Sequence, residues 1–98
     1  MRARVQASFD RQAMMATLGA ELVSVEPGRA ELALRHDARF TQQHSFMHAG
    51  AVAAVLDSAC GYAAFSLMPA DAAVLTVEFK TNLLAPAKGE RFLFRASV

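Results

Sequence analysis

Apolar residues near the N-terminus recur at steps of three and four, as they do along one face of a helix. These residues are Val5, Phe9, Ala13 and Ala16. The spacing predicts an amphipathic helix over residues 6–18. Ser8 can serve as its N-cap, and Gly19 can end it as the residue after the last turn.

The pattern then changes to alternation. Residues 21–26 and 29–35 both favour strands, and the second segment alternates apolar with charged side chains. Between them, Pro27 stands where a turn needs a fixed φ, and Gly28 stands where a type II turn needs a positive φ. We therefore expect a β-hairpin. Residues 36–47 show no period and carry polar groups, so we expect a loop there.

The twenty residues from Ala49 to Met68 are small and apolar on every side. A helix of this kind is buried in a core or spans a membrane, and its length permits either. Asp57 near its middle would cost about 2.5–3.5 kcal/mol in a bilayer, and strand-like segments follow it. We therefore expect a buried central helix that Pro69 ends, with a membrane span as the minor alternative.

Two more alternating segments follow this helix. Residues 74–84 and, after a turn at 85–89, residues 92–98 both favour strands. The chain stops inside the last pattern, so we expect it to be a fragment of a longer domain. The order helix, two strands, long helix, two strands predicts one α+β domain over residues 1–98, with the long helix covered by an antiparallel sheet.

Composition excludes several classes of function. A chain of 98 residues that is 54% hydrophobic, with a net charge of +1, is neither disordered nor basic enough to favour nucleic acid. A lone cysteine, Cys60, excludes an internal disulfide framework and is expected to be a small core residue. The three histidines form no metal-ligand pattern, so no metal is expected. The N-terminus lacks the apolar stretch of a signal peptide, and the expected location is the cytoplasm.

Asp57 is the strongest candidate for chemistry, because carboxylates are rarely buried unless they are paired or functional. Its neighbours one turn away on the predicted helix are all small: Ala53, Ala54, Cys60, Gly61 and Ala64. Such a face leaves space for a ligand, and Gly61 in mid-helix costs up to about 1 kcal/mol against alanine. A carboxylate that caps a loop or pairs with an arginine explains the pattern equally well.

The residues that open the same helix are further candidates. The backbone N–H groups of Ala49 and Gly50 lack intrahelical partners and can hold an anion or a developing oxyanion. His48 could contact a substrate or act as a base, although hydrogen bonding to the loop is the commoner role. Gln42 and Gln43 could orient a water or a carbonyl, or could be solvated loop residues.

Basic residues of the later segments could meet phosphates, although solvated strand and turn charges are the commoner case. They are Lys80, Lys88, Arg91 and Arg95. No GxSxG, P-loop or GxGxxG sequence is present, so serine-based acyl transfer and nucleotide chemistry have no local support.

The chain resembles the hotdog-fold acyl-CoA thioesterases of the phenylacetic-acid-degradation type, the PaaI-like thioesterase family. The resemblance covers nearly the whole chain and is carried by His48-Ala49-Gly50, by Asp57 nine residues after the histidine, by Leu75-Thr76-Val77-Glu78-Phe79, and by Asn82-Leu83-Leu84-Ala85-Pro86-Ala87 with Gly89-Glu90. It implies a long helix wrapped by a curved antiparallel sheet, with further strands after Val98. It also implies a homodimer or a dimer of dimers with interfacial sites, no metal and no other cofactor.

The resemblance implies hydrolysis of an acyl-CoA thioester to free acid and CoA. Asp57 would be the general base or nucleophile, and the N–H of Ala49 or Gly50 would polarise the thioester carbonyl. Gln42 falls where relatives often have an asparagine, and Thr76 where some have a serine that assists the attacking water. A hotdog protein that binds acyl-CoA without turnover is the alternative.

Some residues depart from the family pattern. The family has histidine-glycine-glycine where this chain has His48-Ala49-Gly50. Glutamine replaces asparagine, and Gln42 and Gln43 cannot be separated. Strand alternation puts Thr76 on a polar face, so we expect it to serve a site only through a bulge or against a partner subunit. Asp57 lies about 13 Å along the helix from the N-terminal donors, so we expect acid and donor to come from different subunits.

Overall fold

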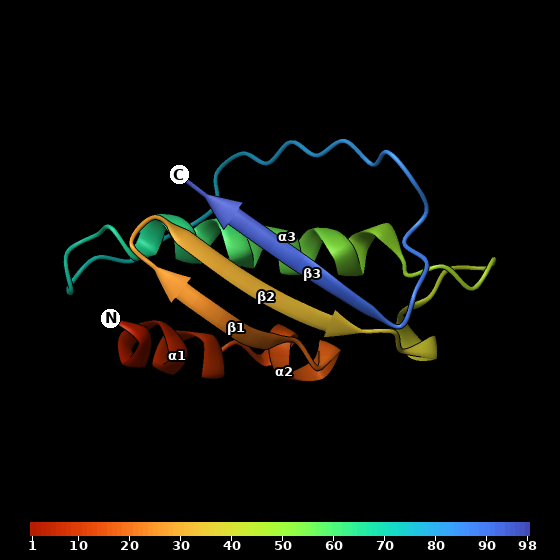
Figure 1. The fold of residues 1–98 in the computed structure, drawn as a ribbon, viewed down its shortest axis with the longest axis horizontal. Coiled ribbons are helices and arrows are strands. Elements are labelled where there is room, and N and C mark those ends of the chain that lie inside the picture. Colours follow the sequence, from red (N-terminus) through yellow and green to blue (C-terminus); the bar gives the residue numbers. More distant parts are fainter.

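The computed structural model describes residues 1–98 as helices packed on a three-stranded sheet (Figure 1). In chain order the elements are α1 (Arg2–Asp10), α2 (Ala13–Leu18), β1 (Glu21–Glu26), β2 (Arg29–Arg35), a 3₁₀ helix η1 (Ala38–Phe40), α3 (Ala49–Phe65) and β3 (Arg91–Ser97). The strands are antiparallel in the order β1-β2-β3. The long helix α3 packs against β2 and β3, and α1 lies against β1. The expected α+β class is confirmed.

The N-terminal helical region is two helices, so the prediction of one helix over 6–18 is wrong. The chain breaks at Arg11 and Gln12, between α1 and α2. Gln12 is extended (φ −80°, ψ 103°), and one extended residue is enough to interrupt the helical repeat. Ser8 lies inside α1 and is not its N-cap. Gly19 ends α2 as expected, with the left-handed φ of 75° that favours glycine.

The expected hairpin joins β1 to β2. Glu26 lies opposite Arg29, and Gly28 has the positive φ, 76°, that the predicted turn requires. The turn is also tied to the end of α3. The buried N–H of Gly28 donates to the Ser66 hydroxyl at 2.8 Å, and this hydroxyl donates to the Ala63 carbonyl at 2.7 Å.

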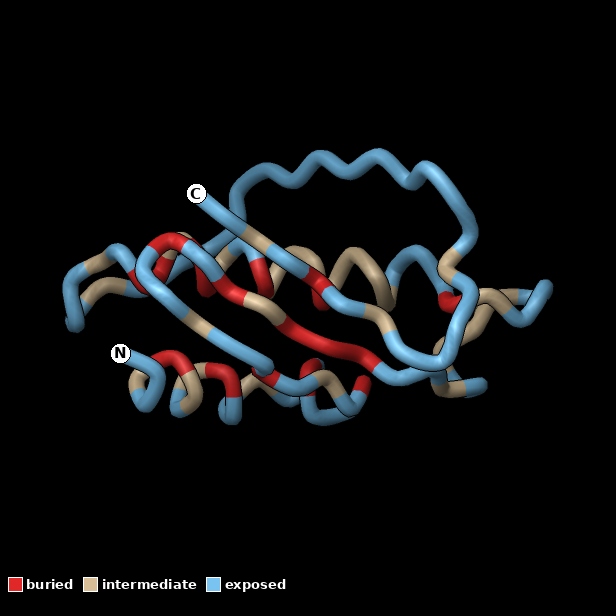
Figure 2. Tube along the Cα trace, in the orientation of Figure 1, coloured by how far each residue is buried: buried red, intermediate tan, exposed pale blue.

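The core lies between the sheet and one face of α3. Leu32 and Leu34, which lie two residues apart on one face of β2, are 0% exposed. On α3 the residues that meet them recur at every fourth position: Val55, Ala59 and Ala63 are at most 1% exposed. Buried stretches of β2 and α3 therefore face each other (Figure 2). Small side chains at 59 and 63 allow the helix to lie close to the strands.

The helix α3 is buried on this face only, which corrects the expectation of a helix buried on all sides. It runs from Ala49 to Phe65 and so ends three residues before the expected limit. Cys60 is exposed, so its expected role as a core residue is wrong; it lies outside the stripe that meets the sheet. No helix of the structure combines the length and the apolar character needed to cross a membrane.

Residues 74–84 do not form the strand that their alternation predicts. No hydrogen bond joins their backbone to the sheet, and the segment is exposed along its length (Figure 2). Leu75 and Val77 are 88% and 96% exposed. Alternation describes side chains only, whereas a strand also needs a neighbour for its N–H and C=O groups. The second expected strand is confirmed as β3, on the free edge of β2.

The hydroxyl that bridges hairpin and helix generates a stability prediction. Ser66→Ala should lower the free energy of unfolding by about 1–3 kcal/mol, because it leaves the buried Gly28 N–H without an acceptor. Chemical denaturation followed by circular dichroism measures this change. The control is Ser24→Ala, at an exposed position of β1, which should cost less than about 0.5 kcal/mol. Equal effects of the two substitutions would contradict the bridge.

Candidate active site

Asp57 lies on the face of α3 that turns away from the sheet. It follows Val55 by two residues, which places it roughly 200° around the helix from the buried stripe. Its side chain is half-buried, and its Oδ1 accepts a hydrogen bond from the Thr76 hydroxyl at 2.8 Å. Thr76 thus contacts Asp57 within one chain. The expected strand had predicted that Thr76 could reach a site only through a bulge or in a partner subunit. Since residues 74–84 are not in a sheet, alternation does not fix the direction of Thr76.

A pocket of about 430 Å³ opens beside this pair. It lies between α3, the junction of α1 and α2, and residues 72–76. Gly61 contributes free space to it: a Cβ placed there would have Val74 Cγ1, at 3.9 Å, as its nearest neighbour. Of the five small neighbours of Asp57 on the helix, Gly61 is the one that lines this pocket and leaves room there for a ligand.

The pocket also has a polar wall that sequence reasoning missed. The Tyr62 hydroxyl accepts a hydrogen bond from Gln12 Nε2 at 2.9 Å and lies 3.1 Å from the Ser8 hydroxyl. Ser58 in turn donates to Gln12 Oε1 at 3.4 Å. The ring of Tyr62 is buried in the core. The sequence did contain one indication of this polar wall. A buried tyrosine usually needs a hydrogen-bond partner, so the hydroxyl of Tyr62 implied that polar side chains lie beside it.

His48 caps the N-terminus of α3. Its Nδ1 accepts the Gly50 N–H at 2.7 Å, so the ring bonds the first turn of α3 and does not bond the loop, which was named above as the commoner role. A Cβ at position 50 would lie only 2.9 Å from that nitrogen, so any other residue there would displace the His48 ring. The Ala49 N–H, by contrast, makes no hydrogen bond within the chain. Of the two candidate oxyanion donors, Ala49 is therefore the one left available.

The two loop glutamines differ in what they contact. Gln42 Oε1 accepts the backbone N–H groups of His44, at 2.6 Å, and Phe46, at 3.2 Å, so this side chain folds its own loop. Gln43 is exposed and makes no side-chain hydrogen bond. Of the predicted site residues, the structure gathers three around the pocket: Asp57, Thr76 and Gly61. The other five lie outside its lining: His48, Ala49, Gly50, Gln42 and Gln43.

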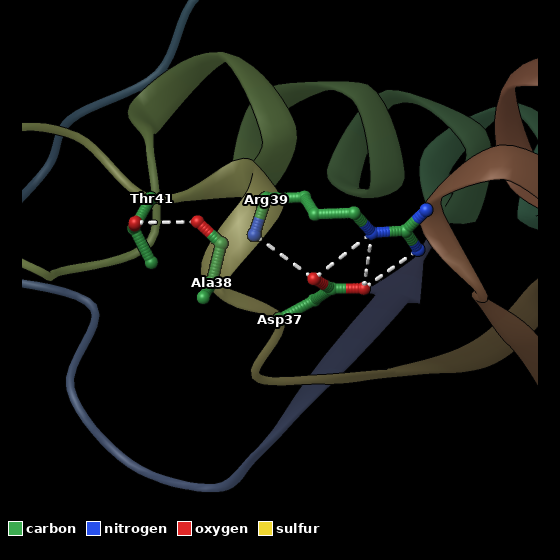
Figure 3. Close-up of polar contacts among 4 residues, drawn as sticks. All are labelled: Asp37, Ala38, Arg39 and Thr41. Carbon is green, nitrogen blue, oxygen red and sulfur yellow. Dashed lines mark hydrogen bonds and ion pairs between the residues drawn. The ribbon is translucent and has the colours of Figure 1, made fainter.

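The loop that leads to α3 begins with a compact polar turn (Figure 3). The Asp37 carboxylate accepts the Arg39 backbone N–H at 2.9 Å and pairs with its guanidinium at 2.8 Å. The Thr41 hydroxyl donates to the Ala38 carbonyl, also at 2.8 Å. The side-chain and backbone hydrogen bonds from Arg39 lower the pKa of Asp37 below its usual 3.8. This turn directs the chain from β2 toward Gln42 and the helix N-terminus.

Comparison with known proteins relates this geometry to a family. The thioesterase superfamily matches residues 44–98, which include α3, residues 74–84 and β3. A crystal structure of a thioesterase family protein from Silicibacter pomeroyi is 64% identical, with a TM-score of 0.94, over 96% of this chain and 69% of that one. A comparison with curated proteins gave no match.

More distant solved structures share the fold. The PaaI protein of the E. coli phenylacetic acid degradation operon is 21% identical, with a TM-score of 0.86, over 97% of this chain and 67% of that one. A conserved protein from Pseudomonas aeruginosa is 27% identical, with a TM-score of 0.83, over 88% of this chain and 69% of that one. The fold is the expected hotdog fold of the PaaI-type thioesterases. The chain belongs to the thioesterase superfamily.

The polar turn generates a pH prediction. Because the folded pKa of Asp37 is depressed, its contribution to stability should be present above pH 3.8 and be lost as the pH falls through the folded pKa. Carboxyl titration by NMR should therefore give a midpoint below 3.8 for Asp37. Arg39→Gln should move the midpoint back toward 3.8. An unchanged midpoint in that variant would refute the assignment to Arg39.

Proposed function

We propose that this protein hydrolyses an acyl-CoA thioester to the free acid and CoA, with Asp57 as general base or nucleophile. The observation that carries the proposal is the Asp57–Thr76 pair beside the pocket. This half-buried carboxylate is held by a neutral hydroxyl and forms no salt bridge. Pairing with an arginine, one of the structural roles considered for Asp57, therefore does not account for it. Membership of the thioesterase superfamily supports thioester hydrolysis in general.

The chemistry proposed needs only groups of the chain and a water. In the general-base route, Asp57 takes a proton from a water as the water oxygen bonds to the thioester carbon. A backbone N–H, assigned to Ala49, stabilises the negative charge on the carbonyl oxygen. The C–S bond then breaks, CoA leaves as the thiolate, and the proton passes to the sulfur. A positioned base contributes typically 10²–10⁴-fold, and one oxyanion donor roughly 10²–10³-fold.

The spacing along α3 leads us to propose that two subunits build each site. Ala49 precedes Asp57 by eight residues, or roughly 12 Å along the helix axis. One thioester carbonyl cannot contact both groups of a single helix at that separation. A homodimer, or a dimer of dimers, would bring the Ala49 donor of one copy to Asp57 of the other, with His48 and Gln42 or Gln43 beside it.

Exposed apolar side chains support this assembly. Leu75, Val77 and Leu84 are 88%, 96% and 93% exposed, and exposed apolar patches commonly mark contact surfaces. Light scattering should give at least a dimer at micromolar concentration. Thiol release from short-chain, medium-chain and aryl-CoA esters tests the activity itself. Binding of these esters with thiol release at background would favour the non-catalytic alternative.

Asp57→Asn tests the role of the acid. The substitution keeps size and burial while it removes the base, so kcat should fall by about 10²–10⁴-fold with little change in melting temperature. Steady-state thiol release and thermal unfolding measure the two quantities. Full activity of the purified variant would refute the assignment.

The same variant tests the two-subunit arrangement when it is mixed with Ala49→Pro. Proline lacks the N–H and is well accepted as the first residue of a helix, and His48 before it already has the extended conformation that proline prefers (φ −62°, ψ 136°). Each variant alone should be impaired, and mixed dimers should regain one working site. Ala49→Gly, which keeps the N–H, is the matched control. No rescue in verified mixed dimers would contradict sites shared between subunits.

Thr76→Val tests the hydroxyl that holds Asp57. Valine keeps the shape of threonine but cannot donate to the carboxylate, so kcat should fall by about tenfold, the equivalent of one hydrogen bond to a charged group. Thr76→Ser restores the donor and should recover most of the activity. A loss of the same size in the serine variant would show that the methyl group matters, and that the hydrogen bond does not.

A further inference from the structure

A second hollow lies outside the Asp57 pocket, where β2 ends and β3 begins. It has a volume of about 460 Å³ and is lined by Arg35, His36, Ser45, Lys88, Gly89 and Glu90, none of which is apolar. The His36 N–H donates to the Glu90 carbonyl at 2.8 Å, which joins the two sides of the hollow. Its walls are thus set by backbone contacts between the end of β2 and the segment before β3.

The strand pairing places a second like charge opposite one cation of this hollow. Arg35 of β2 lies directly opposite Arg91 of β3. Four pairs further along the same strands, Glu31 lies opposite Arg95 and forms an ion pair with it at 3.1 Å. Like charges directly opposite each other destabilise a sheet. Neither Arg35 nor Arg91 forms a salt bridge, so the chain itself does not offset this repulsion.

The acidic residues nearby do not neutralise the cluster. The carboxylate of Asp37 is occupied by Arg39 (Figure 3). Glu90 is then the single carboxylate on the lining, and it stands against Arg35, Lys88 and the adjacent Arg91. Two cations on the lining, Arg35 and Lys88, with Arg91 next to Glu90 in the chain, form an arrangement that can bind phosphate through charge-assisted hydrogen bonds.

The hollow lies at the same end of the molecule as the N-terminus of α3 (Figure 1). The Met47 N–H donates to the Ala87 carbonyl at 3.1 Å. Lys88 directly follows Ala87, and Ala49 comes two residues after Met47. The unpaired Ala49 N–H therefore lies on the chain segment next to the hollow, close to a ligand whose phosphates occupy it.

We propose that this hollow binds the phosphate groups of the CoA part of the substrate, with Arg35 and Lys88 of its lining as contacting cations and Arg91, opposite Arg35 in the sheet, as a third cation at its edge. The proposal rests on the proposed function, because it assigns the nucleotide end of the same thioester. The pantetheine arm would run from the hollow past the α3 N-terminus to the site where Asp57 acts. The two basic strand residues, which oppose each other in the free sheet, would then be bridged by the anion.

Substrates that differ only in their phosphates test the proposal. One acyl group is presented on CoA, on dephospho-CoA, on 4′-phosphopantetheine and on pantetheine. Arg35→Gln, Lys88→Gln and Arg91→Gln should each raise KM for the acyl-CoA by roughly three- to tenfold and leave kcat/KM for the acyl-pantetheine unchanged. The matched control is Arg29→Gln, at the exposed opposite end of β2, which should behave as the wild type. Loss of the effect with dephospho-CoA would assign the 3′-phosphate, and its retention would assign the diphosphate.

Equal losses on acyl-CoA and acyl-pantetheine, or no loss on either, would overturn the proposal. A general folding defect would lower activity on both substrates equally and would also lower the melting temperature. Removal of one of two opposed arginines should instead leave the melting temperature unchanged or raise it. Calorimetric binding of CoA and of pantetheine to the same variants separates this proposal from the proposed function. If the wild type releases no thiol, weaker CoA binding in Arg35→Gln still supports the hollow, and unchanged CoA binding overturns it.

Discussion

The packing of one apolar helix on a three-stranded sheet is the constraint on which the rest of the structure depends. The stripe of Val55, Ala59 and Ala63 commits one face of α3 to β2 and β3, and it is almost fully buried. A helix can present only one such face to a single sheet layer. Whatever lies on the opposite face must therefore find other partners, and Asp57 is the charged residue of that face.

Both ends of α3 are fixed by polar contacts that this packing alone would not provide. At the C-terminal end, the Arg4 guanidinium donates to the Phe65 and Pro69 carbonyls, at 2.9 and 3.0 Å, and lies 4.2 Å from the centre of the Phe65 ring. A cation at this end also meets the negative end of the helix dipole. At the N-terminal end, the His48 ring occupies the Gly50 N–H. The helix is thereby held along its axis, and its first N–H stays unpaired.

The sequence predicted those parts of the fold that depend on local rules. The hairpin needed only a glycine with positive φ at Gly28, and β2 needed only alternation. The helix break at Gln12 was missed; the side chain of Gln12 contacts Tyr62, fifty residues away, and no local pattern shows such a contact. For the same reason the partners of Ser8 could not be found: a serine in the first turns of a predicted helix is read locally as a cap, and its contact lies on another helix.

In the candidate site, too, the sequence predicted what depends on local properties and missed what depends on distant contacts. Asp57 was identified from its apolar surroundings, a local property, but the direction of Thr76 was not. Alternation assigns faces to a strand only when neighbouring strands hold its backbone flat, because hydrogen bonds to those neighbours fix the pleat. Residues 74–84 lack such neighbours in this chain, so Thr76 takes its direction from Asp57. The contact that positions this hydroxyl is therefore with a side chain of α3, and the candidate acid, Asp57, also holds the neighbouring segment at Thr76.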